Sequence, residues 1–179
     1  MKTEKGGWTL VYSYTFTNYS NFYDASNAVT PRPNWPANQS DVNISETVPL
    51  SESSLGAINF TLWKDIGEEF IIKSNISNWF ACKPEQDGGS IVQAKKGTLA
   101  CRNIKSVVTT CSNNLTDEPI KIMWTGYGPR LDGKSVIVRF DGSTSEAIPT
   151  HNPCKRTAET DRRNHKSGVL NPAGAIYLR

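Results

Sequence analysis

The sequence predicts an α+β domain in which a twisted, mostly antiparallel sheet is combined with one main helix and long loops. Three observations lead to this prediction. Residues 8–17 alternate large apolar with polar side chains, the pattern of a strand. Residues 53–66 carry apolar side chains at helical spacing. The rest of the chain consists of short apolar runs separated by Gly and Pro, with no repeat or linker that would divide residues 1–179 into two domains.

The first strand is expected over residues 8–17, where one face would carry only large apolar residues: Trp8, Leu10, Tyr12, Tyr14 and Phe16. Residues 27–49 follow, with four prolines among Asn and Ser. Because proline cannot donate to a strand ladder, this segment predicts a long surface loop, which Trp35 would pin to the core.

The one predicted helix spans residues 53–66. Its apolar stripe consists of Leu55, Ile58, Leu62 and Ile66, and Gly67 supplies a C-terminal stop. Asn59 would lie beside this buried stripe, so its glycosylation sequon is expected to be unused.

Short strands are predicted over the remainder, at residues 69–73, 78–82, 90–94, 104–108, 120–124, 136–140 and 175–178. Two of them, 120–124 and 136–140, are separated by a segment rich in Gly and Pro. This arrangement predicts a hairpin with a long loop.

The charge and hydropathy of the chain exclude some partners. The net charge is +3 and is spread evenly, which is too little for a nucleic-acid footprint, so no nucleic acid is expected as a partner. No apolar run approaches the roughly 18 residues needed to cross a bilayer. The chain would therefore meet a membrane only through other domains of a parent protein.

Cysteines and sequons point to the secretory pathway. The four cysteines form no Cys-x-x-Cys pair and all lie in the C-terminal half: Cys82, Cys101, Cys111 and Cys154. Six Asn-x-Ser/Thr sequons occur. Asn59 is expected to be unused, and glycans are expected at the other five, Asn18, Asn38, Asn43, Asn75 and Asn114. A secreted, extracellular glycoprotein with disulfide bonds is therefore predicted. Residues 2–5 do not resemble a signal peptide, so the chain is expected to be a piece of a longer extracellular protein.

Several segments of the chain resemble fibrinogen-related domains. The opening Met1-Lys-Thr-Glu-Lys-Gly-Gly-Trp-Thr-Leu-Val11 resembles their start, with Lys5 in place of the first glycine. The ending Pro172-Ala-Gly-Ala-Ile-Tyr-Leu-Arg179 is similar to the closing strand of intelectin-like members. A longer likeness is to the fibrinogen-like region of cnidarian extracellular proteins, such as those of the coral skeletal organic matrix, and is carried by residues 6–19, 27–33, 48–52, 140–145 and 151–154.

The resemblance implies that the whole chain is one fibrinogen-like domain that serves extracellular recognition or adhesion, binding a glycan or a matrix or cell-surface protein. The alternative is a structural scaffold of a secreted organic matrix, mineralised in the coral case. A sequence pI of 8.7 argues against an acidic surface that would template carbonate, so a matrix role would be adhesive. Either role allows the chain to form oligomers.

The resemblance also bears on the disulfides, because relatives carry a further cysteine just before the residues that match Met1. If that cysteine is absent, one of the four present lacks its natural partner, and the pairing stays open. We favour Cys82 with Cys101, which would close a short hairpin, and Cys111 with Cys154.

Metal sites and cofactors are not expected. The ligand types of a zinc cage occur at irregular spacing, and disulfides are favoured for the three cysteines among them: Cys101, Cys111, Cys154 and His151. Fibrinogen-related domains often bind calcium, but the Asp-x-Asp loop that they use is absent here and the acidic residues are scattered. Calcium is thus left without a ligand loop.

Catalysis is not predicted either. The only imidazole bases are His151 and His165, each in a polar segment, and neither a Gly-x-Ser-x-Gly nor a His-Glu-x-x-His motif occurs. A hydrolase is a distant third interpretation, after a binding module and a scaffold.

Candidate binding residues lie in two kinds of segment. Residues 155–166 carry a surplus of positive charge that includes Arg162 and Arg163, which would suit a sulfated or other anionic glycan, although a solvated loop is the favoured interpretation. Aromatic residues at loops and strand ends, Trp79 among them, could form a sugar-binding face. Of these we retain Trp35 and Tyr127 as candidates, with core packing as an equal alternative.

Overall fold

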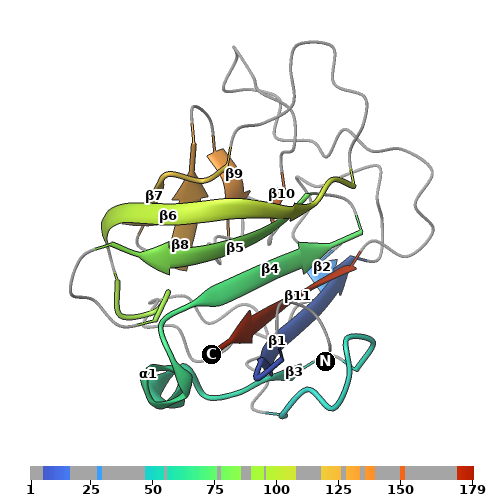
Figure 1. Cartoon of the computed structure of the whole chain (residues 1–179). Coiled ribbons are helices and arrows are strands. Elements are labelled where there is room, and N and C mark those ends of the chain that lie inside the picture. Colours follow the sequence, from blue (N-terminus) through green and yellow to red (C-terminus); the bar gives the residue numbers. More distant parts are fainter. Residues whose placement is uncertain are drawn as a thin grey trace.

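The computed structural model describes residues 6–16, 28–29, 47–54, 56–75, 78–85, 90–94, 96–107, 118–125, 128–133, 136–139, 150–151 and 173–179. Their strands form one 11-stranded sheet of antiparallel pairs, in the order β10-β9-β8-β7-β6-β5-β4-β11-β1-β2, with β3 beside β1 (Figure 1). The strands nearest the two chain ends, β1 (Thr9–Phe16) and β11 (Ala173–Leu178), pair with each other.

The sheet continues on both sides of this pair. The remaining strands are β2 (Ala28–Val29), β3 (Gly56–Ala57), β4 (Phe70–Ser74), β5 (Trp79–Pro84), β6 (Lys96–Lys105), β7 (Lys121–Thr125), β8 (Gly128–Asp132), β9 (Val136–Arg139) and β10 (Thr150–His151).

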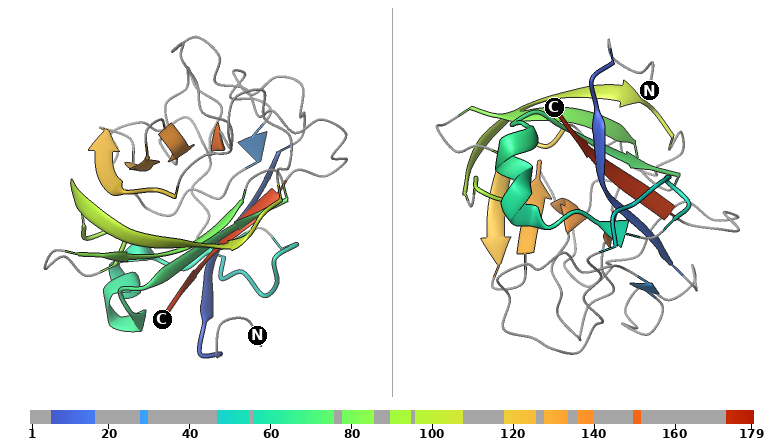
Figure 2. Two further views of the ribbon diagram at one scale, coloured as in Figure 1. Left: turned by 45° about the horizontal axis from the view of Figure 1, so that its top comes forward. Right: turned by 90° about the horizontal axis from the view of Figure 1, so that it is seen from below.

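The predicted α+β class is wrong, because the sheet curls into a half-barrel and the fold is mainly β (Figure 2). Helical structure in the described part is limited to a 3-10 turn, η3 (Phe60–Leu62), and the single turn α1 (Trp63–Ile66). Seen from below, α1 lies across one end of the curled sheet, where Trp63 is fully buried. Neither of these helical segments has the length or the apolar character needed to cross a membrane.

The helix predicted at residues 53–66 is wrong for a local reason. Polar side chains there bond to nearby backbone groups, which withdraws those groups from a helical ladder. Ser54 Oγ accepts hydrogen bonds from the amides of Leu50 and Ser51 at 3.0 and 2.9 Å. These bonds close a turn, and the chain then enters strand β3 instead of a helix.

The loss of that helix also removes the argument against glycosylation of Asn59. Asn59 is half-buried, and its Oδ1 accepts hydrogen bonds from the amide and the hydroxyl of Thr61 at 3.1 and 2.9 Å. Thr61 is exposed, so the sequon lies at the surface and not beside a buried stripe. The predicted stop at Gly67 is confirmed, since its amide donates to Trp63 O at 3.2 Å and ends α1.

A β-bulge in β1 overturns the predicted single aromatic face. The register of β1 against β11 shifts between Leu10 and Tyr12, so the alternation of side chains slips by one residue. Trp8 and Leu10 consequently pack on the outer face of the sheet, whereas Val11 and Tyr12 pack in the inner core. The strand itself is confirmed.

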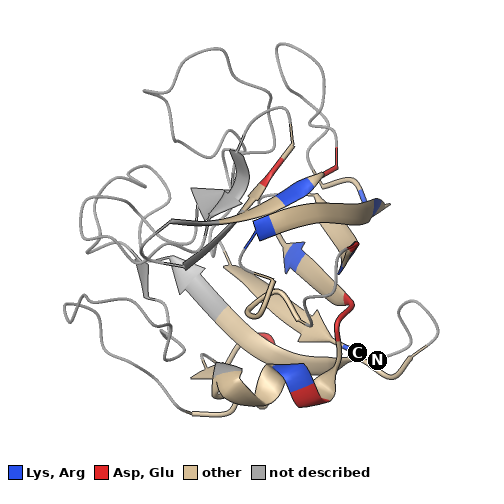
Figure 3. Ribbon diagram, turned by 90° about the vertical axis from the view of Figure 1, so that its left-hand side faces the viewer, with Lys and Arg blue, Asp and Glu red and all other residues tan. Residues whose placement is uncertain are grey.

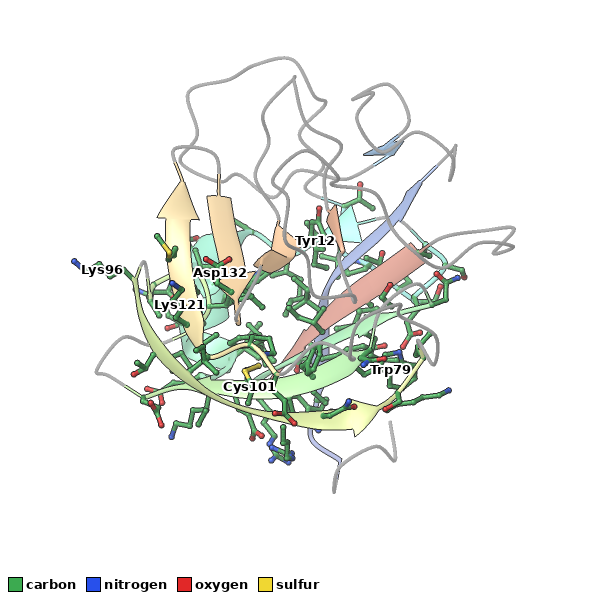
Figure 4. All side chains as sticks on the ribbon, turned by 90° about the horizontal axis from the view of Figure 1, so that it is seen from above. Tyr12, Trp79, Lys96, Cys101, Lys121 and Asp132 are labelled. Carbon is green, nitrogen blue, oxygen red and sulfur yellow. A yellow bond between two sulfur atoms is a disulfide. The ribbon has the colours of Figure 1, made fainter. Side chains whose placement is uncertain are left out.

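The two faces of the sheet carry separate apolar clusters. The inner cluster fills the curl and holds the largest fully buried side chains: Trp63, Phe70, Phe80, Ile72, Ile91, Ile122, Leu131 and Ile176. The outer cluster is smaller and consists of Trp8, Ile71, Ala81, Ala175 and Tyr177, with Leu10 and Ile104 packed against it. Figure 4 shows Tyr12 and Asp132 on the inner side of the curl.

The predictions for the short strands are partly confirmed. Strands occur near the predicted positions 69–73, 78–82, 120–124, 136–140 and 175–178. Residues 90–94 instead form a turn in which the amides of Gln93 and Ala94 donate to Ser90 O. The predicted strand at 104–108 is only the end of β6, which begins at Lys96. The predicted hairpin is also wrong, because β8 occupies its loop and pairs with both β7 and β9.

The disulfide between Cys82 and Cys101 is confirmed. The two residues lie directly opposite each other on β5 and β6, and Cys82 is fully buried. The sulfur of Cys101 lies on the inner side of β6 (Figure 4). Cys111 and Cys154 lie outside the described residues, so their pairing stays a prediction.

Candidate functional site

A groove of about 450 Å³ lies on the outer face of the sheet, where β4, β5, β6 and β11 come together. We call it the lysine–tryptophan groove after three of its lining residues, Lys73, Trp79 and Lys105. Trp79 lies near the end of the long strand β6, at the opposite end from Lys96 (Figure 4). Glu52 and the strand segment of residues 173–175 complete the lining on the side of β11.

Strand alternation brings the two lysines to this face. In β4, Ile71 belongs to the outer cluster and Ile72 to the inner core, so Lys73 follows Ile71 on the outside. On β5 the register shifts between Trp79 and Phe80, and this irregularity places Trp79 opposite Lys105 of β6. The groove thus depends on three neighbouring strands and one bulge.

The ring of Trp79 is held between groups of the two flanking strands. Its Nε1 donates to Ser74 O at 2.7 Å, which fixes the ring plane. The Nζ atoms of Lys73 and Lys105 lie 4.4 and 4.7 Å from the ring centroid. Both distances are within the range of cation–π attraction, so the indole helps to keep two ammonium groups close together.

Lys73 is also the partner of a carboxylate. Its ammonium group forms an ion pair with Glu52 Oε1, and Tyr177 Oη donates a hydrogen bond to the same oxygen. The Lys73 side chain is only 12% exposed, so this pair is largely removed from water, while the Glu52 side chain is 46% exposed. Lys73 Nζ also lies 5.5 Å from the Tyr177 ring centroid.

The pKa values of Glu52 and Tyr177 follow from this contact. Burial raises the pKa of the Glu52 carboxyl, but the hydrogen bonds from Lys73 and Tyr177 and the charge of Lys73 outweigh it, so the pKa lies below its ordinary value. Burial, together with the hydrogen bond to the Glu52 carboxylate and its negative charge, raises the pKa of the Tyr177 hydroxyl. Glu52 is therefore ionised and Tyr177 is neutral at physiological pH.

A serine-rich turn positions Glu52 over the groove. Ser54 Oγ accepts hydrogen bonds from two amides of this turn, and Ser54 O accepts one from the hydroxyl of Ser13. Ser13 is fully buried on β1, so the turn is anchored to the sheet. The carboxylate is thus held in place by the fold and not by its ion pair alone.

Lys105 differs from Lys73 in having no carboxylate partner within the described ranges. The residue is exposed, and its ammonium group approaches only the Trp79 ring among the residues placed by the structure. On the side of the molecule drawn in Figure 3, residues of both signs are interspersed along the described ribbon. The groove lies at the other end of β6, where Lys105 supplies a positive charge that has no carboxylate partner among the described residues.

Similar groups lie at the other end of the outer face, but there both cationic side chains are paired with the carboxylate. Glu69 forms ion pairs with Arg179 at 2.6 Å and with Arg102 at 3.0 Å, and Arg179 stacks on the Trp8 ring at 4.5 Å. Burial raises the pKa of the Glu69 carboxyl, but the hydrogen bonds and charges of the two arginines outweigh it and lower the pKa. We call this cluster the arginine cluster.

Most of the binding residues predicted from the sequence lie outside the described residues. These are Trp35, Tyr127, Arg162 and Arg163, and the sequons at Asn18, Asn38, Asn43 and Asn114. Asn75 is described and exposed, and it lines the groove. Its Oδ1 accepts a hydrogen bond from the Ala173 amide at 2.8 Å, so a glycan there would stand at the rim of the groove.

Of the groove residues, the sequence pattern indicated only Trp79, as one aromatic residue at a strand end, and not the two lysines or Glu52. One signal was available for Lys73. It follows the apolar run of residues 70–72, and strand alternation places it on the same face as Ile71. The remaining partners come from distant parts of the chain, which no local pattern connects.

The described residues contain no group of three or more His, Cys, Asp or Glu that could hold a metal ion. Cys101 is engaged in the disulfide, so the zinc cage considered above loses one of its ligands. The charged groups that the groove offers to a ligand are ammonium groups and one carboxylate.

Comparison of the chain with protein-family models, with curated proteins and with solved structures finds no match.

Proposed function

We propose that this domain is an extracellular recognition or adhesion module that binds a glycan or a matrix or cell-surface protein in the lysine–tryptophan groove. The observation that carries the proposal is the ammonium group of Lys105, which lies at an open groove beside the Trp79 ring and has no carboxylate partner among the described residues. Exposed charged groups beside an aromatic ring are typical of sites that bind polar ligands.

Two further observations support an extracellular location. Stable disulfides are typical of proteins that fold in an oxidising compartment, and Cys82 and Cys101 form one between adjacent strands. The sequons at Asn59 and Asn75 lie at the surface of the described part. The resemblance to fibrinogen-like regions of cnidarian extracellular proteins predicts the same kind of function.

We propose binding and not catalysis because the ionisable groups of the groove are held in fixed partnerships. Glu52 has a lowered pKa and is bound to Lys73 and Tyr177, whose hydroxyl has a raised pKa. A general base or acid needs a pKa near the working pH, and neither group is tuned in that direction.

The proposal can be tested with protein secreted from animal cells behind an added signal peptide. The protein would be applied to arrays of glycans and of extracellular matrix proteins, together with Trp79→Ala and the control Lys83→Ala. Lys83 lies outside the groove, and its side chain is 61% exposed. We expect saturable binding that Trp79→Ala removes and Lys83→Ala leaves unchanged.

Two results would count against a recognition module. Retention of the chain in the cell with unmodified asparagines would contradict the extracellular location. Concentration-dependent self-association without saturable binding to any array component would instead favour the structural scaffold of a secreted matrix.

A further inference from the structure

We infer that the ligand of the lysine–tryptophan groove is an anionic saccharide whose sulfate or carboxylate group is bound by Lys105 and Lys73. This inference rests on the function proposed above and narrows it to one chemical class. It is supported by the charge of the groove, its size, the position of its strands in the sheet and the Glu52 carboxylate, which competes with a ligand for Lys73.

The described lining of the groove contains two lysines and one carboxylate, which leaves a surplus of one positive charge. Attraction to the Trp79 ring stabilises the two ammonium groups but does not neutralise them. A ligand that brings one negative charge would complete the pairing that Glu52 provides for Lys73 alone.

The size and lining of the groove suit a small saccharide. Its volume of about 450 Å³ lies in the lower half of the range for small-ligand sites, roughly 300–1,000 Å³, and fits one or two sugar rings. The backbone of β11 forms one side through Ala173, Gly174 and Ala175, whose small side chains leave room above the strand. Ser106 and Asn75 add polar groups at the rim, which suits the hydroxyl groups of a saccharide.

The position of the strands in the sheet disfavours an extended peptide as the ligand. Peptides commonly bind by adding a strand to a free sheet edge. The groove lies over β4, β5 and β11, which are interior strands with a neighbour on each side. These three strands therefore offer no free edge to a peptide, and recognition would come mainly from side chains, which suits a charged sugar.

Glu52 competes with the ligand for the ammonium group of Lys73. The Glu52 carboxylate forms an ion pair with the ammonium group of Lys73, and the Glu52 side chain is 46% exposed. An incoming sulfate or carboxylate must share Lys73 with Glu52, and the two like charges repel each other. Removing the charge of Glu52 should therefore strengthen binding, an effect that a purely structural Glu52 would not produce.

The test uses calorimetric titration of the whole secreted chain after enzymatic removal of glycans, because Asn75 lines the groove. The probes are a sulfated disaccharide, an unsulfated disaccharide that contains a uronic acid, a neutral disaccharide of the same linkage and an acidic octapeptide. The first two distinguish sulfate from carboxylate as the bound group. The variants are Lys105→Gln, Glu52→Gln and the control Lys83→Gln.

We expect at least one anionic disaccharide to bind and the neutral one to bind at least tenfold more weakly. Lys105→Gln should weaken binding about tenfold, since it removes one charged hydrogen bond. Glu52→Gln should tighten binding about threefold or more, and Lys83→Gln should leave it unchanged. Thermal unfolding of each variant checks that it is folded.

Four results would overturn the inference. Equal affinity for the neutral and anionic disaccharides, with binding still lost in Trp79→Ala, would keep the proposed function and refute the anionic ligand. Preference for the acidic octapeptide would assign the groove to a protein partner. Unchanged binding in folded Lys105→Gln would show that the ligand lies elsewhere, and failure of every array component to bind would refute the proposed function as well.

Discussion

The two ends of the outer face contain the same types of group and differ in how many of their cationic side chains are paired with a carboxylate. Each end has a tryptophan ring, one carboxylate and two cationic side chains: Trp8, Glu69, Arg102 and Arg179 in the arginine cluster, and Trp79, Glu52, Lys73 and Lys105 in the lysine–tryptophan groove. In the arginine cluster both cations contact the carboxylate, whereas in the groove only Lys73 does.

The difference follows from the geometry of arginine and lysine. The guanidinium group is planar and has several donors, so Arg179 can bind Glu69 and still lie over the Trp8 ring. The ammonium group of Lys73 is a point charge that Glu52 and Trp79 share, and Lys105 is left with the ring alone among the described partners. The same composition therefore gives a structural contact at one end and a candidate binding site at the other.

Truncating the two tryptophans should separate these roles most clearly. Trp8 is 9% exposed and packs in the outer cluster, so Trp8→Ala should reduce the free energy of unfolding by about 3 kcal/mol. Trp79 is only half-buried, and Trp79→Ala should cost about 1–2 kcal/mol while abolishing ligand binding. Urea unfolding followed by far-UV circular dichroism measures both values. If both substitutions cost the same and neither affects binding, the groove is structural.

Two glycines provide the next test, because both have positive φ but only Gly67 has another part of the backbone packed against it. A Cβ on Gly67, at φ 155°, would lie 1.9 Å from the main-chain carbon of Arg179, whereas a Cβ on Gly7, at φ 75°, would meet nothing within 4 Å. We expect Gly67→Ala to cost about 2–3 kcal/mol and Gly7→Ala about 1 kcal/mol. Similar losses in the two variants would mean that backbone strain alone, and not the close approach of Arg179, requires Gly67.

Local patterns in the sequence predicted the parts of the fold that depend on neighbouring residues. The alternation over residues 8–17 predicted β1, and the short separation of Cys82 and Cys101 favoured their disulfide. The same alternation could not reveal the bulge at Leu10, because the register of β1 is set by β11 at the other end of the chain. The helical spacing over residues 53–66 misled for a similar reason, since serine side chains bond to the backbone there.

No local pattern in the sequence predicts the groove, because its residues are far apart along the chain. Its carboxylate, Glu52, is hydrogen-bonded to Tyr177, which lies 125 residues away, and Trp79 meets Lys105 only through the pairing of β5 with β6. Lys73 and Lys105 look like ordinary surface lysines in the sequence. Only strand order places them beside the same ring, so no pattern in the sequence predicted this groove.

The smallest expected effect is the dependence of stability on pH. The folded-state pKa of Glu69 is lowered, so its contribution is fully present above the unfolded pKa and is lost as pH falls through the folded value. Glu69→Gln should therefore lower the free energy of unfolding by about 1 kcal/mol at pH 7 and converge with the unmodified chain at pH 3 or below.

Glu52→Gln should also lower the free energy of unfolding at pH 7, because the pKa of Glu52 is lowered too. The loss should be smaller than for Glu69→Gln, since the Glu52 side chain is 46% exposed and that of Glu69 is 19% exposed. Urea unfolding at several pH values between 7 and 3 measures both effects, with Glu68→Gln as the control. Glu68 is 53% exposed and lies 3.5 Å from Lys83, so its removal should have almost no effect. If Glu52→Gln alters the pH dependence more than Glu69→Gln does, then Lys73 is held more firmly by its carboxylate than the arginines are. In that case Glu52 would not yield Lys73 to a ligand, and Lys105 alone would have to bind the anionic group.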